Sequence, residues 1–120
     1  MAQRRLILVP LDGSAASKVA LPTARRVAEI VGGDVWILHV SPQPIPEQDL
    51  PAQIGLSPDE LAGTRLVQTV GIPPVEIVRL AQQRHAWLIV MSTQGARAWR
   101  QRKLGSTTAA VIQQTSCAVL

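Results

Sequence analysis

The chain has 120 residues, 47% of them hydrophobic, and a formal net charge of +4. Its length suits one domain with a hydrophobic core and leaves no room for a second. No apolar run approaches the ~20 residues of a membrane-spanning helix, and the run before Pro10 is too short for a secretory signal. The single cysteine, Cys117, excludes an internal disulfide and fits a reducing compartment, so we expect a cytoplasmic protein without a membrane segment.

Positive charge is concentrated in the second half of the chain. No acidic residue follows Glu76, whereas six basic residues do: Arg79, Arg84, Arg97, Arg100, Arg102 and Lys103. Four of these lie within residues 97–103. Such a local basic patch indicates an anionic partner more specifically than a high isoelectric point does. An ordinary solvated loop explains the same residues equally well.

Two short apolar runs near the N-terminus predict strands. Residues 6–11 and 35–40 are typical of strands buried on both faces of a parallel sheet. Proline is tolerated only near a strand end, so Pro10 places the end of the first strand close to Asp12. A turn at Asp12 should then lead into a helix.

Residues 15–31 predict an amphipathic helix, because alanine and valine recur there at helical spacing. Pro22 has no N–H to donate to the carbonyl of Lys18, so the helix should be kinked there. Gly32 should end it.

Residues 41–63 contain five prolines and four acids, and most of this segment cannot be a regular helix. We predict an irregular, proline-rich surface segment. One short helical turn is expected at residues 58–62, where Ser57 can cap the helix and Pro58 occupies its first position.

The second half predicts an alternation of strands and helices. The expected elements are an edge strand at 65–70, a helix at 74–84, a strand at 87–91, a helix at 106–114 and a strand at 116–120. This order, in a chain whose core must be aliphatic because Phe and Tyr are absent, predicts an α/β fold. We expect a doubly wound, five-stranded, mostly parallel sheet with helices on both faces, forming a single domain over residues 1–120.

Signatures of catalysis are absent from the sequence. It lacks a GxxxxGK[ST] loop, a GxGxxG after the first strand, a GxSxG elbow and a histidine pair at metal-ligand spacing. His39 ends a strand and His85 ends a helix, and both are better explained by packing or helix-end roles. Cys117 begins a strand in apolar company. We expect no catalytic residue and no metal site, and only a weak ATPase activity stays open.

The sequence supports a ligand-binding function more strongly than a catalytic one. Ligands of doubly wound sheets bind beyond the carboxyl ends of the strands, where the strand order reverses. If the first and fourth strands are neighbours at that point, a cleft would be lined by Asp12, Ser92, Gln94 and Gly95. Gly95 and Gly105 would let backbone N–H groups approach a phosphate, and the hydroxyls of Ser106 and Thr107 would add donors at a helix N-terminus. The alternative is an ordinary turn at Gly95 and a helix cap at Ser106.

Four stretches of the chain resemble the universal stress protein family. They are ILVPLDGSAAS, VWILHV, VGIPPVEIVRLAQQRHAWLIVMST and GSTTAAVIQQTSCAVL. Nucleotide-binding members carry glycine, two residues, glycine, nine residues, and then Gly-Ser or Gly-Thr. Gly95, residues 96–104 and Gly105-Ser106 match this pattern, and Ser92 stands in place of the leading glycine.

This resemblance implies a Rossmann-like fold of the adenine-nucleotide alpha-hydrolase type and a site for ATP or AMP, with or without Mg²⁺. Asp12 would lie near the ribose or a metal-bridged phosphate, and Val40 would lie against the adenine. The implied site residues are Pro10, Leu11, Asp12, Val40, Met91, Ser92, Gln94, Gly95, Gly105, Ser106 and Thr107. The resemblance also implies a homodimer.

Three functions follow from these observations. The first is a non-catalytic, ATP- or AMP-binding stress-response module. The second is a nucleotide-free dimerisation or partner-binding module of the same fold, favoured by Ser92. The third, which has the least support, is nucleic-acid binding by Trp99 among the basic residues of 97–103.

Overall fold

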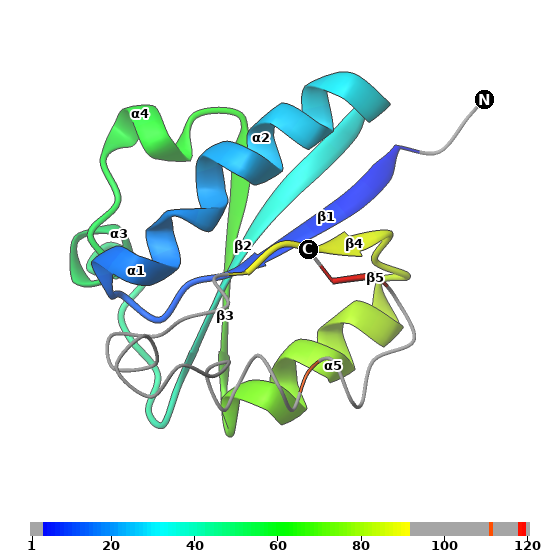
Figure 1. Ribbon diagram of the computed structural model, residues 1–120. Coiled ribbons are helices and arrows are strands. Elements are labelled where there is room, and N and C mark those ends of the chain that lie inside the picture. The colour runs from blue at the N-terminus through cyan, green and yellow to red at the C-terminus, as the bar shows by residue number, and fades with distance from the viewer. Residues whose placement is uncertain (1–3, 92–110, 112–117, 120) are drawn as a thin grey trace.

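The computed structural model describes residues 4–91, 111 and 118–119. The elements follow one another as β1 (Arg5–Pro10), α1 (Ala15–Lys18), α2 (Ala20–Val31), β2 (Gly33–Ser41), α3 (Leu50–Gln53), α4 (Pro58–Leu61), β3 (Thr64–Val70), α5 (Pro73–Gln83), β4 (Leu88–Ile89) and β5 (Ala118–Val119) (Figure 1).

The strands form one sheet in the order β3-β2-β1-β4-β5, and every described pairing is parallel. The chain therefore builds outward from β1 in one direction through β2 and β3, and then returns to the other side of β1 with β4. Leu8 in β1 is in register with Trp36 in β2 and with Ile89 in β4. The predicted α/β class and parallel sheet are confirmed.

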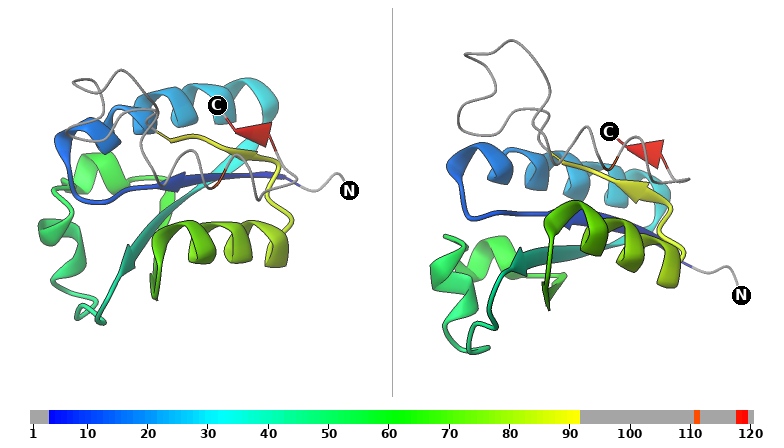
Figure 2. Two further views of the ribbon diagram at one scale, coloured as in Figure 1. Left: turned by 60° about the horizontal axis from the view of Figure 1, so that its bottom comes forward. Right: turned by 90° about the horizontal axis from the view of Figure 1, so that it is seen from below.

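Alternate residues of β1, together with Leu11 directly after it, pack into two separate cores on opposite faces of the sheet. Ile7, Val9 and Leu11 pack with α2, whereas Leu8 packs with α5 on the opposite face. Figure 2 shows α2 and α5 on opposite sides of the sheet. Burying each of these large aliphatic side chains contributes roughly 1.5–3 kcal/mol, so β1 stabilises both faces at once. Buried Val111 joins the core on the α5 side.

The first predicted helix is interrupted in the structure. α1 ends at Lys18 and α2 begins at Ala20, with Val19 between them. The break lies where the missing N–H of Pro22 leaves the Lys18 carbonyl without its helical partner. Gly32 ends α2 as predicted, with φ of 72° and its N–H donating to the Ala28 carbonyl at 2.9 Å.

The segment 41–63 is more ordered than its composition predicts. The helix at Pro58–Leu61 is confirmed, and Ser57 and Glu60 form a reciprocal capping box. The sequence did not predict α3, nor that this segment is partly internal. Leu50, Ile54 and Leu56 are buried in the same core as α2. These three apolar residues attach the segment to the core, although its many prolines and acids suggest an exposed loop.

The second half follows the prediction with shifted boundaries. β3 lies at the edge of the described sheet, and α5 buries Ile77, Val78 and Ala81 as expected. The predicted strand 87–91 is reduced to β4, although Trp87 and Val90 still donate backbone hydrogen bonds to β1. The predicted helix at 106–114 lies outside the described residues except at 111, and the final strand is described only at Ala118–Val119.

Candidate functional site

The sheet gathers the described site residues at the carboxyl ends of neighbouring strands. Pro10 ends β1, with Leu11 and Asp12 directly after it, while Val40 lies near the end of β2 and Met91 follows β4. Because β1 lies between β2 and β4, and neighbouring strands are roughly 4.8 Å apart, these residues share one edge. Ser92, Gln94, Gly95, Gly105, Ser106 and Thr107 lie outside the described residues.

The described site residues combine an apolar floor with one exposed carboxylate. Pro10, Leu11 and Met91 are buried, and Val40 is half-buried. Val40 and Met91 belong to the core on the α5 side, whereas Leu11 belongs to the α2 side. Asp12 is exposed. A half-buried apolar side chain, Val40, at the same edge as an exposed carboxylate suits a flat base joined to a polar sugar.

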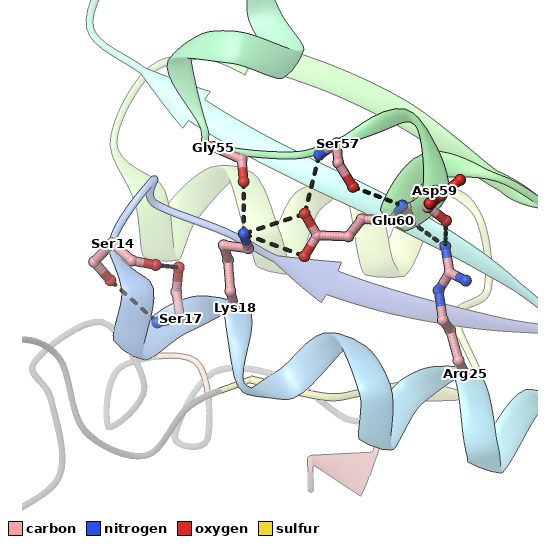
Figure 3. Close-up of polar contacts among 8 residues, drawn as sticks. All are labelled: Ser14, Ser17, Lys18, Arg25, Gly55, Ser57, Asp59 and Glu60. Atoms are coloured by element: carbon pink, nitrogen blue, oxygen red, sulfur yellow. Dashed lines mark hydrogen bonds and ion pairs between the residues drawn. The ribbon is translucent and has the colours of Figure 1, made fainter.

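A network of short hydrogen bonds shapes the turn that carries Asp12. The Ser14 N–H donates to the Asp12 carboxylate at 2.8 Å, and the Asp12 N–H donates to the Ser17 hydroxyl at 3.3 Å. Ser14 and Ser17 then bond to each other twice, at 3.1 and 3.0 Å (Figure 3). Gly13 adopts φ of 93°, a conformation that favours glycine. The carboxylate is therefore held in place before any ligand arrives.

The same network affects the charge of Asp12. Partial burial by itself raises the pKa of Asp12, but hydrogen bonds from Ser14 and Ser17 outweigh this effect and leave the pKa below its ordinary value. The carboxylate is ionised at neutral pH. An anion in this position accepts hydrogen bonds from sugar hydroxyls or binds a cation, and it repels a bare phosphate.

His39 fixes the backbone immediately before this turn. Its buried ring places Nδ1 at 2.8 Å from the Leu11 carbonyl oxygen, and because a carbonyl only accepts, Nδ1 carries the proton. The Leu11 N–H in turn donates to the Leu38 carbonyl at 2.9 Å. The interpretation of His39 as a packed, hydrogen-bonded strand-end residue is confirmed. Its hydrogen-bond partner, Leu11, is one of the candidate site residues.

The segment 41–63 supports the Asp12 turn from behind. A Cβ added at Gly13 would lie 3.6 Å from the Gln53 carbonyl oxygen, so α3 packs directly against the turn. Lys18, at the end of α1, donates to the Gly55 carbonyl at 2.6 Å and pairs with the Glu60 carboxylate at 3.1 Å (Figure 3). Within the described chain, Glu60 is therefore the acid of this segment that forms an ion pair.

Arg25 makes a second attachment between α2 and α4. Its Nη2 donates to the backbone carbonyls of Asp59, Glu60 and Ala62. Hydrogen bonds from Ser57 and Lys18 lower the pKa of Glu60, whose carboxylate is ionised in the pair with Lys18. Two cations from α1 and α2 therefore hold the segment against the helices that follow the Asp12 turn.

Sequence reasoning missed two hydroxyls at this edge. Ser17 holds the Asp12 N–H, and its spacing from Ser14 at the start of a helix was the available signal. Thr69 is the register partner of Val40, and its buried Oγ1 has no hydrogen-bond partner among the described residues. No pattern in the sequence marks Thr69, because only the sheet register brings it beside Val40.

Two further observations concern the described residues. No group of three or more His, Cys, Asp or Glu side chains there is arranged to hold a metal ion. No helix in the described ranges is long and apolar enough to cross a membrane.

Comparison with protein families decides the identity of the fold. The family model of the universal stress proteins matches residues 3–120. The chain belongs to the universal stress protein family. A search of curated protein sequences finds no significant match.

Solved structures of universal stress proteins have the same fold. One, in complex with cAMP, is 23% identical with a TM-score of 0.74, over 99% of this chain and 96% of its own. UspA from Lactobacillus plantarum is 23% identical with a TM-score of 0.73, over 100% and 98%. A universal stress protein from Archaeoglobus fulgidus in complex with dAMP is 20% identical with a TM-score of 0.64, over 100% and 98%.

Proposed function

We propose that this universal stress protein domain is a non-catalytic stress-response module that binds ATP or AMP. The observation that carries the proposal is the preorganised, ionised Asp12 beside the apolar Val40 and Met91, at the edge where β2 and β4 flank β1. Structural neighbours that were crystallised with cAMP and dAMP support an adenine nucleotide as the ligand. We also infer a complete five-stranded, doubly wound sheet, a homodimer and a cytoplasmic location.

Different residues of the candidate site would contact different parts of the nucleotide. Val40 and Met91 would contact the base, and the backbone of Pro10 and Leu11, held by His39, would border it. The Asp12 carboxylate would accept hydrogen bonds from the ribose hydroxyls or bind Mg²⁺ carried by the phosphates, since Mg²⁺ commonly uses one or two protein carboxylates with substrate phosphates.

The phosphates are assigned to the second half of the chain. Gly95 and Gly105 would allow close approach of backbone N–H groups, and the hydroxyls of Ser106 and Thr107 would add donors, with Ser92 and Gln94 completing the wall. This assignment stays a prediction from the sequence.

The described residues near the Asp12 turn support binding without catalysis, because neither titratable side chain there is well suited to act as a base. Among the described histidines, His39 lies nearest the Asp12 turn, and its ring is buried with Nδ1 bonded to the Leu11 carbonyl, which leaves it little access to a ligand. Asp12 is occupied by Ser14 and has a lowered pKa, which makes it a weak proton acceptor. We expect ATP turnover to be absent or very slow.

Titration calorimetry with ATP and AMP, with and without Mg²⁺, tests the proposal. We expect saturable binding that Asp12→Ala weakens by about tenfold, since hydrogen bonds to a charged group contribute roughly 1.5–3 kcal/mol. Asp59→Asn is the control, because it removes a negative charge from an exposed side chain on α4. Absence of heat at high micromolar protein, together with no nucleotide in denatured supernatants, would contradict nucleotide binding.

The alternative function is a nucleotide-free dimerisation or partner-binding module of the same fold. It is favoured by Ser92, whose side chain occupies the position of a glycine in nucleotide-binding members. Sedimentation velocity separates the two functions. A dimer that is unchanged by nucleotide and shows no binding heat supports the alternative, whereas restored affinity in Ser92→Gly identifies this residue as the reason for weak binding.

A further inference from the structure

The amino ends of the strands carry two tryptophans stacked against arginines. The Arg65 guanidinium carbon lies 4.7 Å from the centre of the Trp36 ring, and that of Arg84 lies 5.5 Å from the same ring. Arg5 lies 5.1 Å from the centre of the Trp87 ring. These five residues, here named the amino-edge surface, are at the opposite end of the strands from the Asp12 turn.

Four separate stretches of chain meet to form the amino-edge surface, and Arg5 at the start of β1 is one of them. Trp36 on β2 and Arg65 on β3 are register partners. Arg84 is the residue at which α5 ends. Trp87 precedes β4 and donates its backbone N–H to the Leu6 carbonyl of β1 at 2.8 Å. Because β1 separates β2 from β4, the two tryptophan positions are two strand spacings, or roughly 10 Å, apart.

The arginines of this surface have no carboxylate partner among the described residues. Among the described residues, ion pairs join Arg4 to Asp34, Lys18 to Glu60 and Arg79 to Glu76, and none involves Arg5, Arg65 or Arg84. All three of these arginines are exposed, but Arg5 also donates to the Val31 carbonyl at 3.3 Å. The Arg65 and Arg84 guanidinium groups make no hydrogen bond or ion pair within the described chain, so these two are the ones available for anions. Stacking on an indole fixes the plane of a guanidinium while leaving its N–H edge available to bind phosphate oxygens.

The indoles add a second kind of contact. Trp87 is 42% exposed, which makes it one of the few large apolar side chains on the surface of the described chain, and Trp36 is half-buried. An exposed aromatic ring such as Trp87 can stack on a base while Arg65 and Arg84, on the neighbouring part of the same edge, hold the flanking phosphates. An acidic peptide would use the charges but would leave the indole without a partner.

We propose that the amino-edge surface binds single-stranded nucleic acid without sequence specificity. Arg65 and Arg84 contact phosphates, Trp87 stacks on a base, and Arg5 supports the Trp87 ring. This site is independent of the proposed nucleotide cleft, because it uses none of the same residues. It also differs from the basic segment at residues 97–103, where the sequence places Trp99 among arginines and a lysine.

Fluorescence anisotropy with a labelled oligothymidylate tests the charged contacts. The affinity should fall linearly with the logarithm of the salt concentration, and Arg65→Gln and Arg84→Gln should each reduce that slope by about 0.7. Each should also weaken binding at low salt by about threefold to tenfold. Arg26→Gln, which removes an exposed arginine from α2 on the other face, is the charge-matched control and should retain the wild-type slope.

Paired tryptophan variants test the stacked base. Trp87→Ala should weaken binding by about tenfold or more, as expected for the loss of one base–aromatic stack, whereas Trp99→Ala should bind normally. Melting temperatures are measured as a control and should show that both variants are folded. A larger loss in Trp99→Ala than in Trp87→Ala assigns binding to residues 97–103 and overturns the proposal. An equal loss of oligonucleotide affinity in Arg26→Gln and Arg84→Gln would also overturn the proposal. Equal affinity of the protein for polyglutamate and for the oligonucleotide would overturn it as well.

Discussion

The two ends of the parallel sheet present polar groups in contrasting ways. At the carboxyl end, Asp12, Ser14 and Ser17 are bonded to one another, and His39 secures the adjacent Leu11 carbonyl. At the amino end, Arg65 and Arg84 are held by an indole and have no carboxylate partner among the described residues. The first arrangement fixes one carboxylate in a turn, and the second presents several cations on an exposed surface.

This difference follows from what parallel strands place at each end. The carboxyl ends lead into turns and helix starts, where serine and aspartate side chains satisfy backbone N–H groups. The amino ends receive chain from helix ends, where positive side chains such as Arg84 are favoured. The two ends should therefore respond separately to substitution, except where β1 connects them.

Leu8→Ala should have the largest effect and should damage both ends. Leu8 is fully buried and lies in the strand that pairs with β2 and with β4. Truncating a buried leucine costs about 2–5 kcal/mol of unfolding free energy, measured by urea denaturation. Ile30→Ala is the control, because Ile30 is 77% exposed on α2, and it should change stability by no more than about 0.5 kcal/mol.

His39→Leu should damage the carboxyl end alone. It leaves the Leu11 carbonyl without its donor, at a cost of about 1–3 kcal/mol in urea denaturation. Nucleotide affinity should fall, whereas oligonucleotide binding at low salt should stay at the wild-type level. The matched control is His85→Asn, since His85 is exposed with φ of 54° and asparagine tolerates that conformation. Equal losses of both ligands in His39→Leu would show that the two ends are not separate.

Ser17→Ala should have a smaller effect at the same end. The Asp12 N–H loses its acceptor and Ser14 loses one partner, at a cost of about 0.5–1.5 kcal/mol. Nucleotide affinity should drop a few-fold because the carboxylate is less well positioned. Ser57→Ala removes a comparable hydroxyl from the α4 capping box and should lower stability while leaving nucleotide affinity unchanged.

Acid should produce the smallest effect, again on the carboxyl side. The pKa of Asp12 in the folded protein is below its ordinary value of 3.8, so its stabilising contribution is complete above that value. The contribution is lost as pH falls through the lower folded pKa. Glu60 has the same sign, starting from an ordinary value of 4.5. Between about pH 5 and about pH 3, the melting temperature of Asp12→Asn should fall less than that of the wild type, and a parallel decline would contradict this assignment.

Local chemistry made several elements predictable. Pro22 marked the helix interruption, Gly32 marked a helix end, and Ser57 with Pro58 marked a short helix inside an irregular segment. Each of these residues acts on backbone within one turn of itself, so its effect can be read without knowing the fold. α3 was missed because Leu50 and Ile54 are anchored by the distant core and by no local signal.

The candidate site was predictable only in part. Asp12 could be assigned because strand ends in a parallel α/β fold share an edge, and the family resemblance supplied Val40 and Met91. The hydrogen bond from His39 to Leu11 spans 28 positions in sequence, and the pairing of Thr69 with Val40 depends on the register of β3. No short pattern records such contacts.

The sequence by itself determined the α/β class, the family, the Asp12 turn and the glycine spacing at Gly95 and Gly105. These depend on periodicity and on residues close together in the chain. Only the tertiary structure decided which face each helix covers, that 41–63 supports the Asp12 turn, and that Trp36 and Trp87 meet arginines at the amino end. The physical reason is that these contacts arise from strand order and register, which bring distant residues together once the sheet has formed.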